Sequence, residues 1–260
     1  MAGLFDKQAE IYADARPTYP KEWYSMLAGL TSSHTLAWDV ATGNGQAAIG
    51  VAEYYEHVVA TEVSKEQLNH VKPHPRIRYE HTPLSLNDDD LVKLVGGEGT
   101  VDLITVATAI HWFDLSRFYS VVNRLLRTPG GVLAVWTYSG FEVFPLFDVV
   151  FKRFSDTTLP YFDPKVKYVL EEYRTLPFPF ERLDLGFEGN PKPMDMKREV
   201  SFAGFLRFLR SYSGVTTAKE RGVDLLSKEV VGELESAWGG PSLIRKVVYK
   251  GWMLIGRVKK

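Results

Sequence analysis

Between residues 35 and 136, short apolar runs alternate with segments whose apolar residues recur at helical spacing. The runs are rich in Val, Ile and Leu, and those at residues 58–63 and 101–107 are apolar almost throughout. Continuous apolar runs are typical of strands that are covered on both faces, and strands that alternate with helices are typical of a parallel sheet. The pattern therefore predicts an α/β domain with helices on both faces of a mostly parallel sheet.

The segment that begins at Asp114 carries the clearest helical pattern. Asp114 is a candidate N-cap, and Pro129 followed by two glycines is a stop signal. Five apolar residues between these limits share one helical face: Phe118, Val121, Val122, Leu125 and Leu126. We expect a helix here that packs on the sheet and leads into a strand ending at Trp136.

After Trp136 the regular alternation is lost. Seven of the fourteen prolines fall between Pro145 and Pro193, among many Phe and Tyr residues. Long irregular insertions in a compact domain are usually lids or binding loops. We therefore expect residues 141–200 to form an inserted, aromatic acceptor-binding cap. Beyond it the pattern predicts a strand at 195–201, helices within 202–213 and 223–238, and a long final strand or hairpin arm at 245–259.

Composition and charge narrow the function classes. The 260 residues suit a single domain, 1–260, and the formal net charge of -1 argues against nucleic-acid binding. The absence of cysteine excludes disulfides and thiolate chemistry. No apolar stretch is long enough for a membrane span, and Asp6, Lys7 and Glu10 interrupt any N-terminal leader, so we expect a cytoplasmic protein. No metal site is expected, because Pro73 separates His70 from His74.

A glycine loop follows the first predicted strand and precedes a helix near Gln46. It runs from Asp39 to Gly45 in the order D-V-A-T-G-N-G. Two glycines allow a tight turn and a close approach of a ligand to the backbone. Glu62 ends the next strand, where a carboxylate can accept hydrogen bonds from a ribose. Because Ala48 also fits the dinucleotide fingerprint, the glycines alone leave dinucleotides and other nucleosides open.

The order D-x-x-T-G-x-G, the acid after the second strand and the A-I-H-W-F-D segment at 109–114 resemble the class I S-adenosylmethionine-dependent methyltransferases. More narrowly, Phe5, Ala9, Tyr12, Arg16-Pro17, Tyr19-Pro20 and residues 111–114 resemble the branch of trans-aconitate methyltransferase-like and plant farnesoic-acid-methyltransferase-like proteins. The resemblance covers most of residues 1–140. It implies a Rossmann-like fold with a mostly parallel seven-stranded sheet, an antiparallel C-terminal strand and an inserted cap.

The resemblance also implies a set of cofactor-binding residues. The amino-acid moiety of S-adenosyl-L-methionine would be held by Asp39 and the backbone of Ala41, Thr42, Gly43 and Gly45. Tyr12 and Arg16 of the N-terminal segment are further candidates, for the cofactor carboxylate or for the acceptor. Glu62 would accept both ribose hydroxyls. The loop of Thr82, Pro83 and Leu84, together with Trp112, would border the adenine, and Ala107 and Thr108 would line the methionine side.

Two positions depart from the family pattern. Ala41 stands where many members have glycine, which costs little if its φ angle is negative. Thr82 and Pro83 stand where many members have an acidic residue near the adenine amino group, which leaves adenine recognition to apolar packing and backbone contacts.

His111 is the candidate catalytic residue, because we expect it to end the fourth strand at the ligand-binding edge of the sheet. A neutral imidazole there can take a proton from a hydroxyl or hydrogen-bond to a carboxylate. The alternative is a structural corner formed with Trp112 and Phe113. The other candidate acceptor-binding residues are Tyr19, Trp136, Tyr161 and Phe162. Residues 1–20 are expected to form a flap, in which Arg16 suits a carboxylate, with a surface position as the alternative.

These expectations favour S-adenosylmethionine-dependent methylation of a small, largely apolar molecule by a monomer or homodimer. The resemblance to carboxyl methyltransferases favours a carboxylate oxygen and a methyl ester product, with a hydroxyl or an amine as alternatives. A binding protein that keeps the cofactor fold as a scaffold is the competing interpretation, since fold alone does not guarantee turnover. Retention of Gly43, Gly45 and Glu62 argues against it.

Overall fold

The computed structural model describes residues 17–183 and 191–259, and its centre is one mixed sheet. The strand order is β3-β2-β1-β4-β5-β9-β6, with β7 and β8 also paired to β9. Strands β1 to β5 are parallel neighbours, and β9 runs antiparallel to β5. The bounds are β1 Leu36–Val40, β2 His57–Glu62, β3 Ile77–His81, β4 Leu103–Ala107, β5 Val132–Glu142, β6 Glu181–Arg182, β7 Lys192–Pro193, β8 Met196–Ser201 and β9 Ile244–Arg257.

The predicted mostly parallel sheet with an antiparallel C-terminal strand is confirmed. The described sheet has nine strands rather than seven. The difference arises because β9 is long enough to pair with β6, β7 and β8 in succession along its length.

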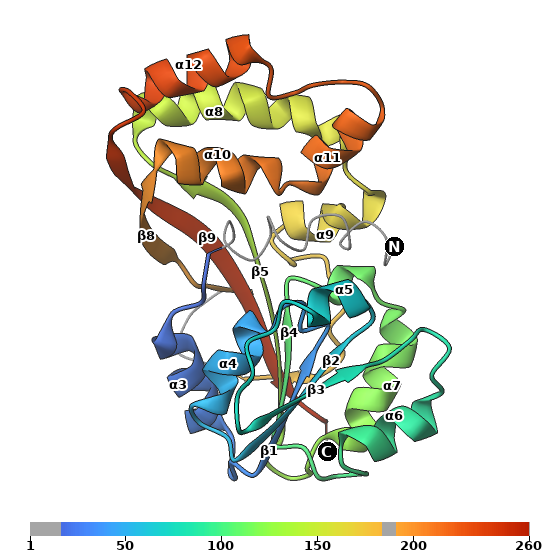
Figure 1. Cartoon of the computed structure of the whole chain (residues 1–260). Helices are drawn as coiled ribbons and strands as arrows, with labels where there is room; N and C mark the ends of the chain where they lie inside the picture. Colours follow the sequence, from blue (N-terminus) through green and yellow to red (C-terminus); the bar gives the residue numbers. More distant parts are fainter. Residues whose placement is uncertain (1–16, 184–190, 260) are drawn as a thin grey trace.

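Helices cover both faces of the parallel strands (Figure 1). Along β5, Ala134 and Trp136 belong to one buried cluster and Leu133 and Val135 to the other, as the two-residue period of a strand requires. The first cluster packs beneath α3 (Lys21–Leu30) and α4 (Gln46–Ala52), and the second beneath α6 (Asp88–Val95) and α7 (Leu115–Leu125). A short helix, α5 (Lys65–Leu68), follows β2. Helix α7 begins as predicted, because the Asp114 side chain accepts a hydrogen bond from the Arg117 amide.

A second group of helices gathers at the far end of the long strands β5 and β9 (Figure 1). We call α8 (Pro145–Thr158), α10 (Phe202–Arg210), α11 (Ser213–Glu220) and α12 (Lys228–Trp238) the cap. Three short elements, η2 (Leu159–Tyr161), η3 (Pro164–Val166) and α9 (Lys167–Leu170), continue the chain from α8. The four helices of the cap therefore come from residues 145–158 and 202–238. Only the first of them lies within the predicted insertion, residues 141–200, and the other three come after it in the sequence.

Three sequence expectations need correction here. Strand β5 does not end at Trp136 but continues to Glu142 through an irregularity between Tyr138 and Phe141. The segment 213–220, for which the sequence predicted no helix, forms α11. The last helix begins at Lys228, five residues later than predicted, because Ser227 caps it.

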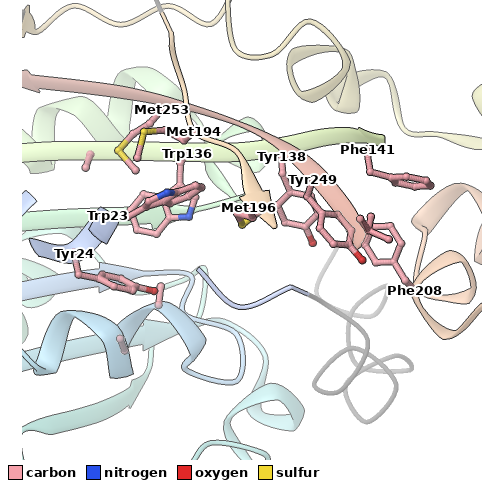
Figure 2. Close-up of a cluster of buried hydrophobic side chains, with 14 of the residues drawn as sticks. Trp23, Tyr24, Trp136, Tyr138, Phe141, Met194, Met196, Phe208, Tyr249 and Met253 are labelled. Carbon is pink, nitrogen blue, oxygen red and sulfur yellow. The ribbon is translucent and has the colours of Figure 1, made fainter. Parts of the chain in front are cut away.

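The cap and the sheet share one hydrophobic cluster. Figure 2 shows buried side chains from Trp23 and Trp136, on the sheet side, through Tyr138 and Tyr249 to Phe208 of the cap. Tyr138 packs against Tyr249, and Tyr249 against Phe208, with ring centroids 6.3 and 5.1 Å apart. Because these residues lie on β5, β9 and α10, the cluster fixes the cap in place above the carboxyl end of the sheet. None of the helices within the described ranges has the length and apolar character that crossing a bilayer requires.

Candidate active site

The glycine loop leaves the carboxyl end of β1 in a left-handed backbone conformation. Gly43 and Gly45 have φ angles of 58° and 85°. At Gly45 a Cβ atom would lie 2.6 Å from the Tyr79 hydroxyl, whereas at Gly43 the nearest atom would be Gln67 Oε1 at 3.8 Å. Gly45 is therefore closed in by the protein itself. Gly43 is the point at which the loop backbone is open to a ligand.

Ala41 also lies in the left-handed region, with φ of 53°. The condition under which alanine would cost little at this position, a negative φ angle, is therefore not met. A residue with a Cβ costs roughly 1–2 kcal/mol in this conformation, so alanine at this position stores strain that glycine would not.

Asp39 lies beneath the loop and is fully buried. One carboxylate oxygen accepts a hydrogen bond of 2.6 Å from the Thr105 hydroxyl, and the other accepts one of 2.5 Å from the Thr42 hydroxyl. Burial raises the pKa of Asp39 to about 6, against the opposing effect of these hydrogen bonds. Its contacts with Thr42 and Thr105 brace the loop from below and tie β1 to β4.

Glu62 joins the glycine loop to the end of β2. Its Oε2 accepts a hydrogen bond of 2.9 Å from the Gly43 amide, and its Oε1 accepts bonds from the amides of Val63 and Ser64. These three donors use three of the roughly four lone-pair sites of a carboxylate. One ribose hydroxyl can join them directly, whereas a second requires that one of these three amide hydrogen bonds break.

The loop after β3 lies beside Glu62. The Thr82 amide donates to the Glu62 carbonyl at 2.9 Å. This contact places the start of the loop formed by Thr82, Pro83 and Leu84 at the carboxyl end of β2. The Leu84 side chain is 80% exposed. An exposed leucine in this loop suits the apolar packing on an adenine ring that the sequence predicted.

Thr108 marks the carboxyl end of β4, directly after Ala107. It is a β-branched residue with φ of 54°, a conformation that such residues rarely adopt. Its amide donates to the Trp136 carbonyl at 2.7 Å, and its hydroxyl lies 3.5 Å from the Tyr19 hydroxyl. Strained residues of this kind concentrate at functional sites.

A cavity of about 150 Å³ opens between Thr108 and the cap. Among the described residues its walls contain no Lys, Arg, Asp or Glu. They consist of aromatic, aliphatic and hydroxyl side chains together with His111. The lining residues are Thr108, His111, Trp112, Tyr138, Ser139, Gly140, Phe151, Ser155, Phe162, Val166, Val169, Leu170, Phe208, Ser211, Tyr212 and Ser213.

His111 belongs to the wall of this cavity but does not end the fourth strand. Strand β4 ends at Ala107, and His111 lies in η1 (Ile110–Trp112), a turn that the apolar pattern does not distinguish from the strand. The imidazole is 5% exposed, and its Nδ1 lies 3.1 Å from the Tyr173 hydroxyl. Burial lowers the pKa of His111 to about 4; to a smaller extent, the charge of Asp163 raises this pKa and that of Lys165 lowers it. The ring is therefore neutral near pH 7.

Of the other described residues predicted to bind the cofactor or the acceptor, some line the cavity and others lie away from it. Phe162 and Trp112 line the cavity beside His111. Tyr161 instead packs under Arg221, with the guanidinium carbon 5.8 Å from the ring centroid. Trp136 is buried, at centroid distances of 5.3 Å from Tyr19 and 6.2 Å from Trp23. Tyr12 and Arg16 lie outside the described residues, as does most of the expected flap.

Sequence reasoning missed the part of the wall that comes from the cap. Phe208, Ser211 and Tyr212 stand at the junction of α10 and α11. The signal available was the aromatic and hydroxyl-rich stretch at 208–213, whose neighbours in space the sequence does not reveal. Among the described residues, no group of three His, Cys, Asp or Glu side chains is placed to hold a metal ion.

Comparison with known proteins gives consistent matches across this site. A family model described as a methyltransferase domain matches residues 38–135, which include the glycine loop, Glu62 and His111. A putative methyltransferase of Dictyostelium discoideum is 30% identical over 216 residues, which are 80% of this chain and 79% of that protein. A methyltransferase of Aspergillus candidus is 32% identical over 133 residues, but this chain covers 41% of its length.

A solved structure also resembles the whole described fold. The structure of a putative type II methyltransferase from Anaeromyxobacter dehalogenans has a TM-score of 0.79 and 32% sequence identity. The match covers 93% of this chain and 97% of that one. The likeness therefore extends over the cap as well as the sheet.

Proposed function

Because this chain belongs to the class I S-adenosylmethionine-dependent methyltransferases, we propose that it binds S-adenosylmethionine at the glycine loop and methylates a small, largely apolar acceptor in the cap cavity. The observation that carries the proposal is the position of Thr108. Thr108 directly follows β4, and β4 pairs with β1, the strand that leads into the glycine loop. Thr108 also lines the cavity. Donor and acceptor sites thus meet at one edge of the sheet, as ligands do in open parallel folds.

The residues at the loop fit the cofactor. Gly43 leaves the backbone open where a Cβ would stand, and Glu62 keeps one lone pair for a ribose hydroxyl. Asp39 holds the loop in shape from below through Thr42. When bound, the cofactor supplies a sulfonium methyl group that is already activated for transfer. The protein then has to align the acceptor with that methyl group and exclude water.

We assign the acceptor atom to a carboxylate oxygen, so that the product is a methyl ester. A carboxylate has no proton to lose near neutral pH, whereas a hydroxyl needs a base. His111 is the titratable side chain of the described cavity wall best placed for that role, but its pKa of about 4 makes it a weak base. Hydroxyl groups of Thr108, Ser155 and Ser213 also line the cavity and can hydrogen-bond to a carboxylate.

The cavity also accounts for the expected apolar skeleton. Phe151, Phe162 and Phe208 offer apolar area to the remainder of the acceptor. A volume of about 150 Å³ lies below the ~300–1,000 Å³ of pockets for drug-sized ligands, so the acceptor is small. Its burial beneath the cap keeps water from competing for the methyl group.

The test is a transfer assay with S-adenosylmethionine labelled on the methyl group and a panel of small carboxylic acids, phenols and amines. We expect label in an organic product of one or more acids, and mild alkali should release that label as methanol. Methyl ethers and methylamines survive the same treatment. Label that is stable to alkali would contradict the carboxylate assignment, and absence of transfer to every member of the panel would contradict the proposed acceptor class.

A further inference from the structure

Tyr173 contacts His111, a residue of the cavity wall, from a distant part of the chain. Its hydroxyl lies 3.1 Å from Nδ1 of His111, although 62 residues separate the two in sequence. Both side chains are buried. His111 Nε2 makes no hydrogen bond to any residue that the structure describes, so it is the nitrogen available to a molecule in the cavity.

The backbone that carries Tyr173 is strained. Glu172 and Tyr173 both have φ of 59°, a left-handed conformation that residues with a Cβ atom seldom adopt. The turn is held by hydrogen bonds from the Tyr173 amide to the Tyr168 carbonyl and from the Glu172 amide to the Val169 carbonyl. Two consecutive strained residues that direct a tyrosine towards His111 point to a functional requirement.

The contact between Tyr173 and His111 bears on the position of the imidazole proton, because the nitrogen that accepts a hydrogen bond cannot also carry that proton. A neutral imidazole has one donor nitrogen and one acceptor nitrogen. A phenol is the better acid of the two groups and an imidazole nitrogen the better base. The favoured hydrogen bond therefore runs from the Tyr173 hydroxyl to Nδ1, which leaves the ring proton on Nε2.

We infer that Tyr173 is a positioning residue that holds His111 in the Nε2–H form, so that the imidazole donates a hydrogen bond to the acceptor in the cavity. The role of that donor rests on the proposed function: it suits a carboxylate oxygen and cannot take a proton from a hydroxyl. His111 then orients the acceptor, with no part in proton removal. Trp112, whose ring centroid lies 4.7 Å from that of His111, packs beside the ring and limits its tilt.

The test is nitrogen-15 NMR of the histidine rings in the full chain, with S-adenosylhomocysteine added and no acceptor. His111→Gln identifies the His111 signals among the six histidines. We expect wild-type His111 to carry its proton on Nε2. In Tyr173→Phe, the Nδ1 signal should move downfield, as an acceptor nitrogen does when it loses its donor.

Tyr119→Phe is the matched control, because the Tyr119 hydroxyl donates to the Pro177 carbonyl at 2.5 Å and does not contact His111. It removes a tyrosine hydroxyl bond to the same segment and should leave the Nδ1 signal in place. A proton on Nδ1 in the wild type, or the same shift in both variants, would overturn the inference. The wild-type spectrum decides alone if Tyr173→Phe fails to fold. Because no acceptor is present, the outcome is independent of the transfer assay.

Discussion

At the residue scale, Ala41 shows how a small departure from a family pattern acquires a physical cost. The sequence shows that alanine replaces the usual glycine at this position. The sign of its φ angle depends on the conformation of the turn between β1 and α4, which the sequence does not reveal. Replacement by glycine removes strain of roughly 1–2 kcal/mol from the folded state. Glycine also gives the unfolded chain more conformational entropy, which lowers the free energy of unfolding by roughly 0.5–1 kcal/mol. We expect Ala41→Gly to stabilise the protein by up to about 1.5 kcal/mol. Urea unfolding measures it, and a destabilised variant would contradict the left-handed φ at Ala41.

His111 and Asp39 make opposite contributions to stability in acid. The folded-state pKa of His111, about 4, lies below its unfolded value of 6.5, so stability from this group is lost as the pH falls through that window. The folded-state pKa of Asp39, about 6, lies above its unfolded value of 3.8, so stability is gained as the pH falls through that window. Between pH 6 and 4 the two contributions oppose each other.

Replacement of His111 removes its contribution to the pH dependence of stability and leaves that of Asp39. We expect His111→Gln to gain stability relative to the wild type as the pH falls from 7 to 4.5, by about 2–3 kcal/mol at the lower pH. Urea unfolding of both proteins at several pH values measures the difference. A difference that stays constant with pH would mean that His111 titrates normally in the folded protein.

At the scale of elements, the sequence predicted a helix or strand boundary correctly where a single residue determines that boundary. Asp114 predicts the start of α7 because its side chain bonds within the first turn. The continuation of β5 past Trp136 could not be predicted, because Gly140 and the irregular pairing from Tyr138 to Phe141 interrupt the pattern. That stretch is a strand because β9 pairs with it from more than 100 residues away.

The turn at η2 distinguishes two neighbouring aromatic residues that the sequence treated alike. Phe162 lines the cavity, whereas Tyr161 packs on Arg221. We expect Phe162→Ala to lower kcat/KM for the acceptor by about tenfold or more, since lost apolar contacts in a pocket are worth about 1–3 kcal/mol. Tyr161→Ala should change it little. Transfer kinetics with an acid from the panel provide the measurement, and the reverse order of effects would place Tyr161 in the acceptor site.

At the scale of the whole molecule, the sheet edge was predictable and the cavity was not. Residues 39–45 and Glu62 lie at the carboxyl ends of β1 and β2, two neighbouring parallel strands, so the chain order itself brings them to one edge. The cavity wall instead depends on His111, Phe162 and Phe208, with Tyr173 behind His111, and these residues come from four separate segments of the chain. No short-range pattern relates them, and the aromatic cluster shared by cap and sheet fixes their positions.

The central claim is that Glu62 and the loop at Gly43 bind S-adenosylmethionine, and calorimetric titration with S-adenosylhomocysteine tests it most directly. We expect the wild type to bind, and NAD to give no binding heat. Glu62→Gln should weaken binding by about 1.5–3 kcal/mol, the usual contribution of hydrogen bonds to a charged group. Glu66→Gln, which alters an exposed carboxylate paired with His70, should bind as the wild type does. Tight binding of NAD without S-adenosylhomocysteine, or equal affinities for wild type and Glu62→Gln, would contradict the claim.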